Sequence, residues 1–576
     1  MGIPSYFSHI VKSHRKIIKQ YKNNMNIDNL YLDCNSIIYD VVYQLDTSAS
    51  SSSPLSDASL EEYILNKICL TISNYIVSIK PSNKVMIAFD GVAPIAKLEQ
   101  QRNRRYKSWF QNEMMKKIKN VETKWDTTCI TPGTQFMKKL NQYIHDFFND
   151  KQSTFNVNEI IVSGSNEPGE GEHKLFDYIR INKDYHKSTT TVIYGLDADL
   201  IMLTLNHLYI SKQLYLFRET PHFIKTIDKT LNPNELYLID IPILEEEIIN
   251  NFITLDTNHT NHTNYTMDIT SFTDEEKKRK VFDYILICFM LGNDFLPHFP
   301  SINIRTNGID ILIHAYKHVF KPHEYLTDGK QIIWKQFRKL ISYLAENELN
   351  YFQDEMKIRR KWEMKQYNQN NSKNANNSKN ANNQTNQNEL EDAFMLLPTK
   401  NREIELYINP GENGWEQRYY KMLFNIDIDQ ERKSQICMNY LEGLEWTLKY
   451  YTQGCPDWRW HYKYHYPPLL KDLLSYTPYF DIEFIHTNDI NDVNETKQVN
   501  EYTQLCYVLP RNSLHYLPTD LYNTILEKYG NLYGLDYKFN WSFCKYFWEA
   551  HAILPHINIE QIELITERYY AKSIDV

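Results

Sequence analysis

Seven acidic residues stand at positions where a metal-dependent reaction could use them. They are Asp33, Asp90, Glu170, Glu172, Asp197, Asp199 and Asp294. Two like charges 4 Å apart repel each other by ~4 kcal/mol at an effective dielectric constant near 20, so these acids could gather only around cations. Oxygen ligands favour hard divalent ions, and we therefore expect Mg²⁺ or Mn²⁺.

Two such ions would indicate a particular reaction class. A pair of metal ions about 4 Å apart can activate a water molecule and stabilise the leaving oxygen of a phosphodiester. The acids therefore predict phosphodiester hydrolysis with two ions. Taken singly, each acid is more typical of a helix cap, a turn or an exposed surface than of a metal site, so this interpretation depends on their number and on the sequence that precedes them.

A basic segment follows the second acid and suggests what the reaction acts on. Residues 97–120 carry eight Lys or Arg residues against two Glu, in a chain whose net charge is −9. At helical spacing one side of this segment presents Lys97, Gln101, Arg104 and Arg105. Guanidinium and amide groups at that spacing suit a terminal phosphate, although a charged run is also typical of a solvated helix face.

The acids require elements that bring them together. Three apolar runs, 29–33, 84–90 and 189–199, each end in an acid. Continuous apolar runs separated by helical stretches predict an α/β fold with a mostly parallel central sheet flanked by helices. Ligand sites in such sheets form at the carboxyl ends of the strands. Glu170 and Glu172 lie at a Gly-rich entry to a helix, which would let both side chains converge on the same place.

Composition places the chain among ordinary globular proteins. Its 576 residues are 42% hydrophobic and 23% charged, which excludes wholesale disorder. The eight Cys residues show no metal-binding spacing and predict reduced thiols in an intracellular protein. No run reaches the ~18 uncharged apolar residues of a membrane helix, so we expect no membrane partner.

Polar segments divide the chain. Three of them are predicted to be loops: residues 47–59, 256–273 and 488–500. The fourth, the Asn-rich residues 366–388, has too few apolar side chains to offset the entropy cost of ordering. We therefore predict a nuclease region at 1–365, a low-complexity insert at 366–393 and a second, mainly helical region at 394–576.

The motifs as a set resemble the XRN family of 5′-to-3′ exoribonucleases. They include MGIPSYF, NLYLDCNSII, FDGVAPIAKLEQQRNRR, CITPGTQFM, EPGEGEHK, YGLDADLIML and GNDFLPHFP, and after the insert YLEGLEWTLKYYTQGCPDWRWHYKYHYPP, VLPRNSLHYLP and FWEAHAILP. The resemblance implies a nuclease core of the PIN and flap-nuclease type, with both halves forming one catalytic body.

The resemblance also implies an activity and its residues. The expected activity is processive degradation of single-stranded RNA from a 5′-monophosphate end to mononucleotides with Mg²⁺. The seven acids would bind the metal and catalyse, and Lys97, Gln101, Arg104 and Arg105 would hold the 5′-phosphate. A pocket that fits one monophosphate should exclude a cap and disfavour a triphosphate. The alternatives are a flap or structure-specific DNA nuclease and a non-catalytic RNA-binding scaffold.

The chain departs from the family pattern at a few positions. Tyr39 stands where the family has a His that stacks on the terminal bases, and the partner Trp is Trp458 or Trp460. Ile95 replaces a basic residue. The absent carboxyl-terminal extension favours a short member of the family. We expect a monomer that acts in the cytoplasm rather than the nucleus, and the sequence indicates no particular protein partner. The Asn-, Ile-, Lys- and Tyr-rich composition is typical of an A+T-rich genome such as that of a protist or a large DNA virus.

Overall fold

A seven-stranded sheet forms the centre of the first half of the chain. The computed structural model describes residues 2–3, 5–22, 25–47, 57–119, 125–218, 231–232, 235–253, 272–376, 383–485 and 498–574. The strand order is β1-β7-β6-β5-β2-β3-β4. These strands span β1 Ile18–Gln20, β2 Asn29–Asp33, β3 Lys84–Ala88, β4 Glu159–Ser163, β5 Thr191–Tyr194, β6 Leu214–Phe217 and β7 Tyr237–Asp240.

Five neighbouring strands, β6-β5-β2-β3-β4, are parallel, and β7 and β1 add an antiparallel edge. The predicted mostly parallel sheet is therefore confirmed. Strand β2 lies between β3 and β5, so the carboxyl ends of the three predicted acid-bearing runs are adjacent. The antiparallel edge was not predicted, because β1 and β7 are only three and four residues long.

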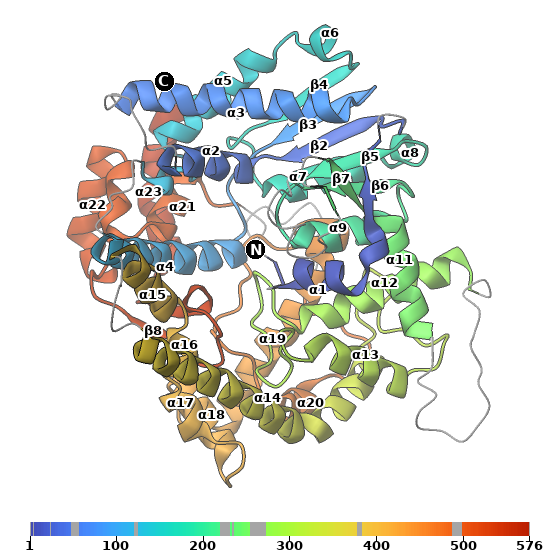
Figure 1. Ribbon diagram of the computed structural model, residues 1–576, viewed down its shortest axis with the longest axis vertical. Helices are drawn as coiled ribbons and strands as arrows, with labels where there is room; N and C mark the ends of the chain where they lie inside the picture. Colours follow the sequence, from blue (N-terminus) through green and yellow to red (C-terminus); the bar gives the residue numbers. More distant parts are fainter. Residues whose placement is uncertain are drawn as a thin grey trace.

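Helices cover both faces of the sheet, as Figure 1 shows. Alternate residues of β2 face two different cores: Tyr31 packs in one, and Leu30 and Leu32 pack in the other. The second core holds residues of α2 Asn35–Thr47, α3 Asp57–Ile79 and α5 Gln135–Phe148. The first core holds residues of α7 Gly171–Ile181, α9 Asp199–His207, α12 Asp274–Phe289, α13 Gly308–Val319, α14 Trp334–Asn376 and α19 Gln430–Gln453.

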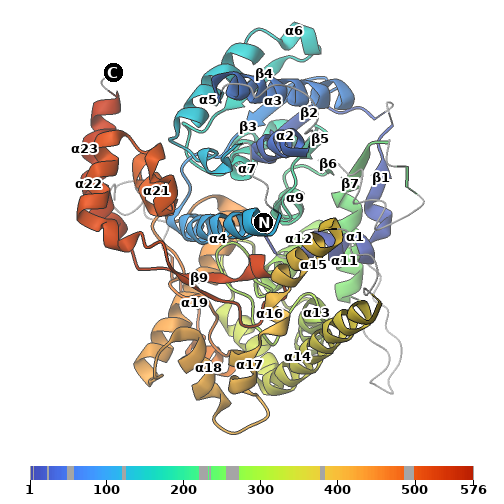
Figure 2. The same cartoon turned by 60° about the vertical axis from the view of Figure 1, so that its left-hand side comes forward.

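The second half packs against the first, which confirms the predicted packing of a mainly helical second region on the nuclease core. The Asn206 amide on α9 donates to the Tyr451 carbonyl of α19 at 2.7 Å. Helix α4, Ile95–Lys119, contacts α21, Glu501–Val508, and Figure 2 shows this carboxyl-terminal group of helices beside α4. The Ile95 amide donates to the Trp458 carbonyl at 2.9 Å, so residues of the second half also hold the start of α4.

The Asn-rich tract differs from its predicted state. Helix α14 continues to Asn376, and α15 begins at Asn383, so the prediction of an unstructured insert is wrong for residues 366–376 and 383–388. Propagating an existing helix adds one hydrogen bond for each residue fixed, whereas starting one is costly. The long apolar-faced part of α14 supplies that start. In the other predicted loops, residues 48–56, 256–271 and 488–497 lie outside the described residues. The ends of the predicted loop 47–59 are helical, because Thr47 belongs to α2 and residues 57–59 belong to α3.

In the described ranges, every helix is too short or too polar to span a lipid bilayer.

Candidate active site

The seven predicted acids converge at the carboxyl edge of the parallel strands. Asp33 ends β2, and the backbone amide of Gly171 at the start of α7 donates to Asp90 Oδ1 at 2.7 Å. Glu170 is the N-cap residue of α7 and Glu172 lies in its first turn. Asp199 opens α9. The Gly-rich helix entry therefore brings Glu170 and Glu172 to one place, as predicted.

Electrostatic interactions connect all seven acids. Burial, followed by the charges of Asp90 and Asp197, raises the pKa of Asp33 well above its usual range. Burial and then Asp199 do the same for the pKa of Glu172. Burial, with Asp294 beside it, raises the pKa of Asp199 to about 7. The acids repel one another as the sequence predicted.

Lys97 lies inside this acidic cluster. Its ammonium group is 2.7 Å from Asp294 Oδ2 and also pairs with Glu170, and only 8% of its side chain is exposed. Burial opposes the charge, but Asp294 and Glu170 raise the pKa of Lys97 well above its usual range. Lys97 was predicted to bind a 5′-phosphate together with Gln101, Arg104 and Arg105; the structure places it against the carboxylates.

The donor set of the cluster suits a divalent ion. Three buried carboxylate oxygens, Asp33 Oδ1, Glu172 Oε2 and Asp199 Oδ1, have no hydrogen-bond partner among the described residues. Oxygen-only ligands are those that Mg²⁺ and Mn²⁺ prefer. Across the described ranges, no three acidic, imidazole or thiol groups already surround one point that could hold an ion; the Lys97 ammonium bridges two of the carboxylates instead.

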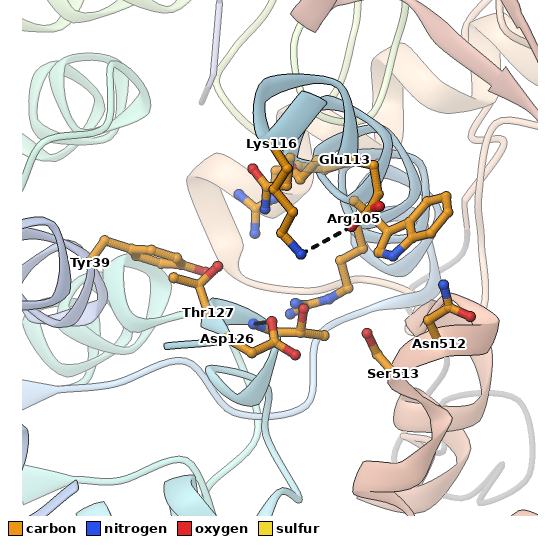
Figure 3. A pocket seen from close by; sticks show the side chains of 13 residues that line it. Tyr39, Arg105, Glu113, Lys116, Asp126, Thr127, Asn512 and Ser513 are labelled. Carbon is orange, nitrogen blue, oxygen red and sulfur yellow. Dashed lines mark hydrogen bonds and ion pairs between the residues drawn. The ribbon is translucent and has the colours of Figure 1, made fainter. Parts of the chain in front are cut away.

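Helix α4 leads from the acids to a pocket with a volume of about 370 Å³. Arg104 and Arg105 line the pocket from α4, and Tyr39 lines it from α2. Figure 3 shows Arg105 and Tyr39 at the pocket. Burial opposes the charge of Arg104, but Tyr39, Asp294, Asp197 and Asp90 raise its pKa. Arg104 therefore lies within electrostatic range of both the pocket wall and the acids.

The other two residues of the predicted phosphate site lie deeper. Among the described residues that line the pocket, neither Lys97 nor Gln101 is present. Gln101 is buried, and its Oε1 atom has no hydrogen-bond partner in the part of the chain that the structure describes. Burial lowers the pKa of Arg105 to about 10, and one of its terminal nitrogens donates to the Ile130 carbonyl at 3.3 Å.

The two candidate tryptophans lie in different surroundings. Trp460 is buried and stacks on Trp446, with ring centroids 5.2 Å apart. Trp458 is half-buried and adjoins α4 through its carbonyl. Tyr39 keeps 38% of its surface exposed. Trp460 is thus a core residue, and Trp458 has the more accessible ring.

Sequence reasoning missed several residues of the site. The Asn35 side chain hydrogen-bonds to Asp90 and accepts from the Asp90 amide at 3.1 Å; its place two residues after Asp33 was a usable signal. The Tyr450 hydroxyl donates to Glu170 Oε1 at 2.8 Å, and its ring stacks on His173 at 3.8 Å. Tyr450 is 280 residues from Glu170, and no local pattern joins the two.

Two family models cover most of the chain. The model described as the XRN 5′-3′ exonuclease N-terminus matches residues 1–220, and the one described as the Xrn1 helical domain matches residues 274–407 and 398–572. The first match spans the strands and helices that carry six of the acids, and the second includes Asp294 and α19.

Curated relatives match nearly the whole chain. A 5′-3′ exoribonuclease 2 homolog of Drosophila melanogaster is 27% identical over 99% of this chain and 71% of its own length. The 5′-3′ exoribonuclease 1 of Homo sapiens is 29% identical over 98% of this chain and 34% of its own length. The 5′-3′ exoribonuclease 1 of Saccharomyces cerevisiae is 27% identical over 90% of this chain and 40% of its own length. With the acids gathered beside a basic pocket and family models matching both halves, the chain belongs to the XRN family of 5′-3′ exonucleases.

Proposed function

We propose that this protein is a metal-dependent exoribonuclease that degrades single-stranded RNA from a 5′-monophosphate end and releases mononucleotides. The observation that carries the proposal is the position of Arg104, which interacts with acids of the cluster and also lines the adjoining pocket. A terminal phosphate held by Arg104 would leave the next phosphodiester beside the carboxylates. The relatives named 5′-3′ exoribonuclease support RNA as the substrate.

The seven acids would hold Mg²⁺ or Mn²⁺, which when bound supplies an activated water and stabilises the leaving oxygen. Arg104 and Arg105 would bind the terminal phosphate by charge-assisted hydrogen bonds. Gln101, whose buried Oε1 atom has no partner within the described ranges, would help to position that phosphate from the buried side of the site. Lys97 would join phosphate binding only by leaving Glu170 or Asp294.

The ring of Tyr39 would stack on a terminal base, with Trp458 as the second ring. Every base has a π-face, and stacking of about 1–3 kcal/mol per base is tolerant of sequence. Such contacts allow repeated steps along any strand, which supports processive degradation. We further propose an intracellular protein that acts as a monomer in the cytoplasm.

The test is a time course on end-labelled RNA of one sequence carrying a 5′-monophosphate, triphosphate or hydroxyl, with a DNA copy as a further substrate. We expect the parent to degrade the monophosphate RNA fastest and only with a divalent ion. Asp197→Ala should abolish degradation, because it removes one acid of the cluster. Arg104→Ala should reduce the preference for monophosphate over hydroxyl.

Each result bears on a different part of the proposal. Equal degradation by the parent and Asp197→Ala would exclude catalysis by the cluster and favour an RNA-binding scaffold. Faster degradation of the DNA copy would favour a DNA nuclease. An unchanged monophosphate preference in Arg104→Ala would remove the assigned phosphate site.

A further inference from the structure

Tyr450 joins the second half of the chain to the acidic cluster. It lies on α19, and its hydroxyl donates to Glu170 Oε1 at 2.8 Å in a buried hydrogen bond. The other oxygen of the same carboxylate, Glu170 Oε2, pairs with the Lys97 ammonium. The two oxygens of Glu170 therefore have different partners: Tyr450 holds one, and the other faces a positive charge among the acids.

Aromatic neighbours fix the ring of Tyr450. On α7, Glu170 is the N-cap residue and His173 follows three positions later, so the two lie close together at the start of the helix. The Tyr450 ring stacks on His173, with centroids 3.8 Å apart and an angle of 27° between the planes. Trp446, about one turn earlier on α19, stacks on Tyr450 at 4.7 Å. Phe295 packs against Tyr450 in a T-shaped arrangement at 5.3 Å.

The support behind Tyr450 belongs to the first hydrophobic core. Trp446 stacks in turn on Trp460, with ring centroids 5.2 Å apart. Tyr450, Trp446, Trp460 and Phe295 are all buried members of that core. Side chains in a close-packed interior have little freedom to move, so the hydroxyl of Tyr450 stays directed at Glu170.

A hydroxyl in this place suits the chemistry of a metal ligand. A carboxylate that binds a divalent ion must present an oxygen at a fixed position, and hydrogen bonds from neighbouring groups provide that orientation. A phenol is uncharged at neutral pH and donates one hydrogen bond. Unlike the Lys97 ammonium, which carries a positive charge of its own, the Tyr450 hydroxyl can keep its bond to Glu170 when a divalent ion is bound.

We propose that Tyr450 is a positioning residue that orients the Glu170 carboxylate for the binding of a divalent ion. This inference rests on the proposed function, because it requires the acidic cluster to bind Mg²⁺ or Mn²⁺. It gives the second half of the chain a part in the metal site, in addition to its contacts with the start of α4. Tyr450 acts through Glu170 and contacts neither the ion nor the RNA.

The test measures Mn²⁺ binding in the absence of RNA, from the electron paramagnetic resonance signal of free Mn²⁺. It compares the parent with Tyr450→Phe, which loses the hydroxyl and keeps the ring that stacks on His173. We expect the Kd for Mn²⁺ to rise by about tenfold or more, as is typical when a group that orients a metal ligand is removed.

Tyr419→Phe is the matched control. Tyr419 is fully buried on α18, Trp415–Phe424, and its hydroxyl donates to the Pro467 carbonyl at 2.9 Å. Each variant loses one buried hydrogen bond, so both should melt slightly below the parent in EDTA. Only Tyr450→Phe should lose affinity for Mn²⁺.

Turnover provides a second readout. At limiting Mn²⁺, Tyr450→Phe should have a lower kcat than the parent, and raising the Mn²⁺ concentration should restore much of it. The KM for 5′-monophosphate RNA should remain as in the parent, because Tyr450 does not line the pocket of Arg104 and Arg105. A residue that only supported the fold would not show recovery with added ion.

The route through Glu170 can be tested with a double variant. In a Glu170→Gln background, Tyr450→Phe should cause little further loss of Mn²⁺ affinity, because residues that act as one unit are not additive. A further loss as large as in the parent background would show that Tyr450 acts through another group and would overturn the proposal.

Two other results would also overturn it: a Kd for Mn²⁺ in Tyr450→Phe equal to that of the parent, or an equal loss of affinity in Tyr419→Phe. Should Tyr450→Phe not fold, Trp446→Phe decides, because it loosens the ring of Tyr450 and leaves the hydroxyl in place; parent affinity in that variant would contradict the proposal. If the parent itself binds no Mn²⁺, it is the proposed metal-dependent function that fails.

Discussion

Trp458 and Trp460 are two residues apart, yet their side chains have different roles in the structure. Trp460 packs on Trp446 in the first core, and its Nε1 atom is 3.4 Å from Glu442. The half-buried Trp458 adjoins the first turn of α4. A ring that stacks on RNA must be accessible, and a ring that fills a core must not be.

These surroundings predict opposite effects of two alanine substitutions. Trp460→Ala should lower the melting temperature markedly, because truncating a buried aromatic residue costs roughly 3–5 kcal/mol. Trp458→Ala should leave the melting temperature nearly unchanged and slow degradation of long RNA. Thermal melts and single-turnover rates on both variants measure this. The reverse pattern would assign the stacking role to Trp460.

At the scale of elements, the start of α7 and the end of β2 approach each other closely in the site. A Cβ atom added at Gly171 would lie 2.6 Å from Asp33 Oδ1 and 3.4 Å from the Ala88 carbonyl oxygen. Gly171 also donates its amide to Asp90. Glycine at this position therefore lets two acid-bearing strands and the Glu-bearing helix meet.

Gly171→Ala should displace the Asp33 carboxylate and reduce kcat by at least about tenfold, since small misplacements of catalytic groups cost up to two orders of magnitude. Stability should change little, because the clashing atom is the end of a side chain. The matched control is Gly530→Ala, where a new Cβ would meet no atom within 4 Å. Equal activity of both variants would show that Asp33 tolerates displacement.

The parts of the site that the sequence could predict are those that a single strand or helix positions. Asp33 and Asp90 could be placed because each follows an apolar run that only a buried strand explains. Contacts between distant elements could not be predicted from the sequence. Lys97 pairs with Asp294, which is 197 residues away, and Tyr450 reaches Glu170 from the other half of the chain. Composition misjudged residues 366–376, because an adjoining helix can extend into a tract that would not fold alone.

At the scale of the whole molecule, the acidic cluster links stability to pH and divalent ions. Burial raises the pKa of Asp33 and Glu172 and brings that of Asp199 to about 7. Without ions, the folded chain thus binds protons that the unfolded chain has already lost. Stability should therefore fall as the pH rises from about 5 toward 8, through the raised pKa of Asp199.

Mg²⁺ should oppose this loss, because an ion that binds only the folded chain stabilises it. We expect Mg²⁺ to raise the melting temperature by a few degrees at pH 8 and by less at pH 5, where protonated acids bind it poorly. Differential scanning fluorimetry with EDTA or MgCl₂ at both pH values measures this. An equal shift at both pH values would point to ion binding elsewhere, and Asp199→Asn should reduce the shift at pH 8.

The hydrogen bond from the Ile95 amide to the Trp458 carbonyl, with that from the Ala93 amide to the Gln504 side chain, has a practical consequence. Residues beyond 450 hold the loop that leads from Asp90 into α4, so neither piece of a chain severed within 377–382 should be able to degrade RNA by itself. Two separately expressed pieces should recover activity on mixing, which would make this chain a starting point for a nuclease that is switched on by reassembly.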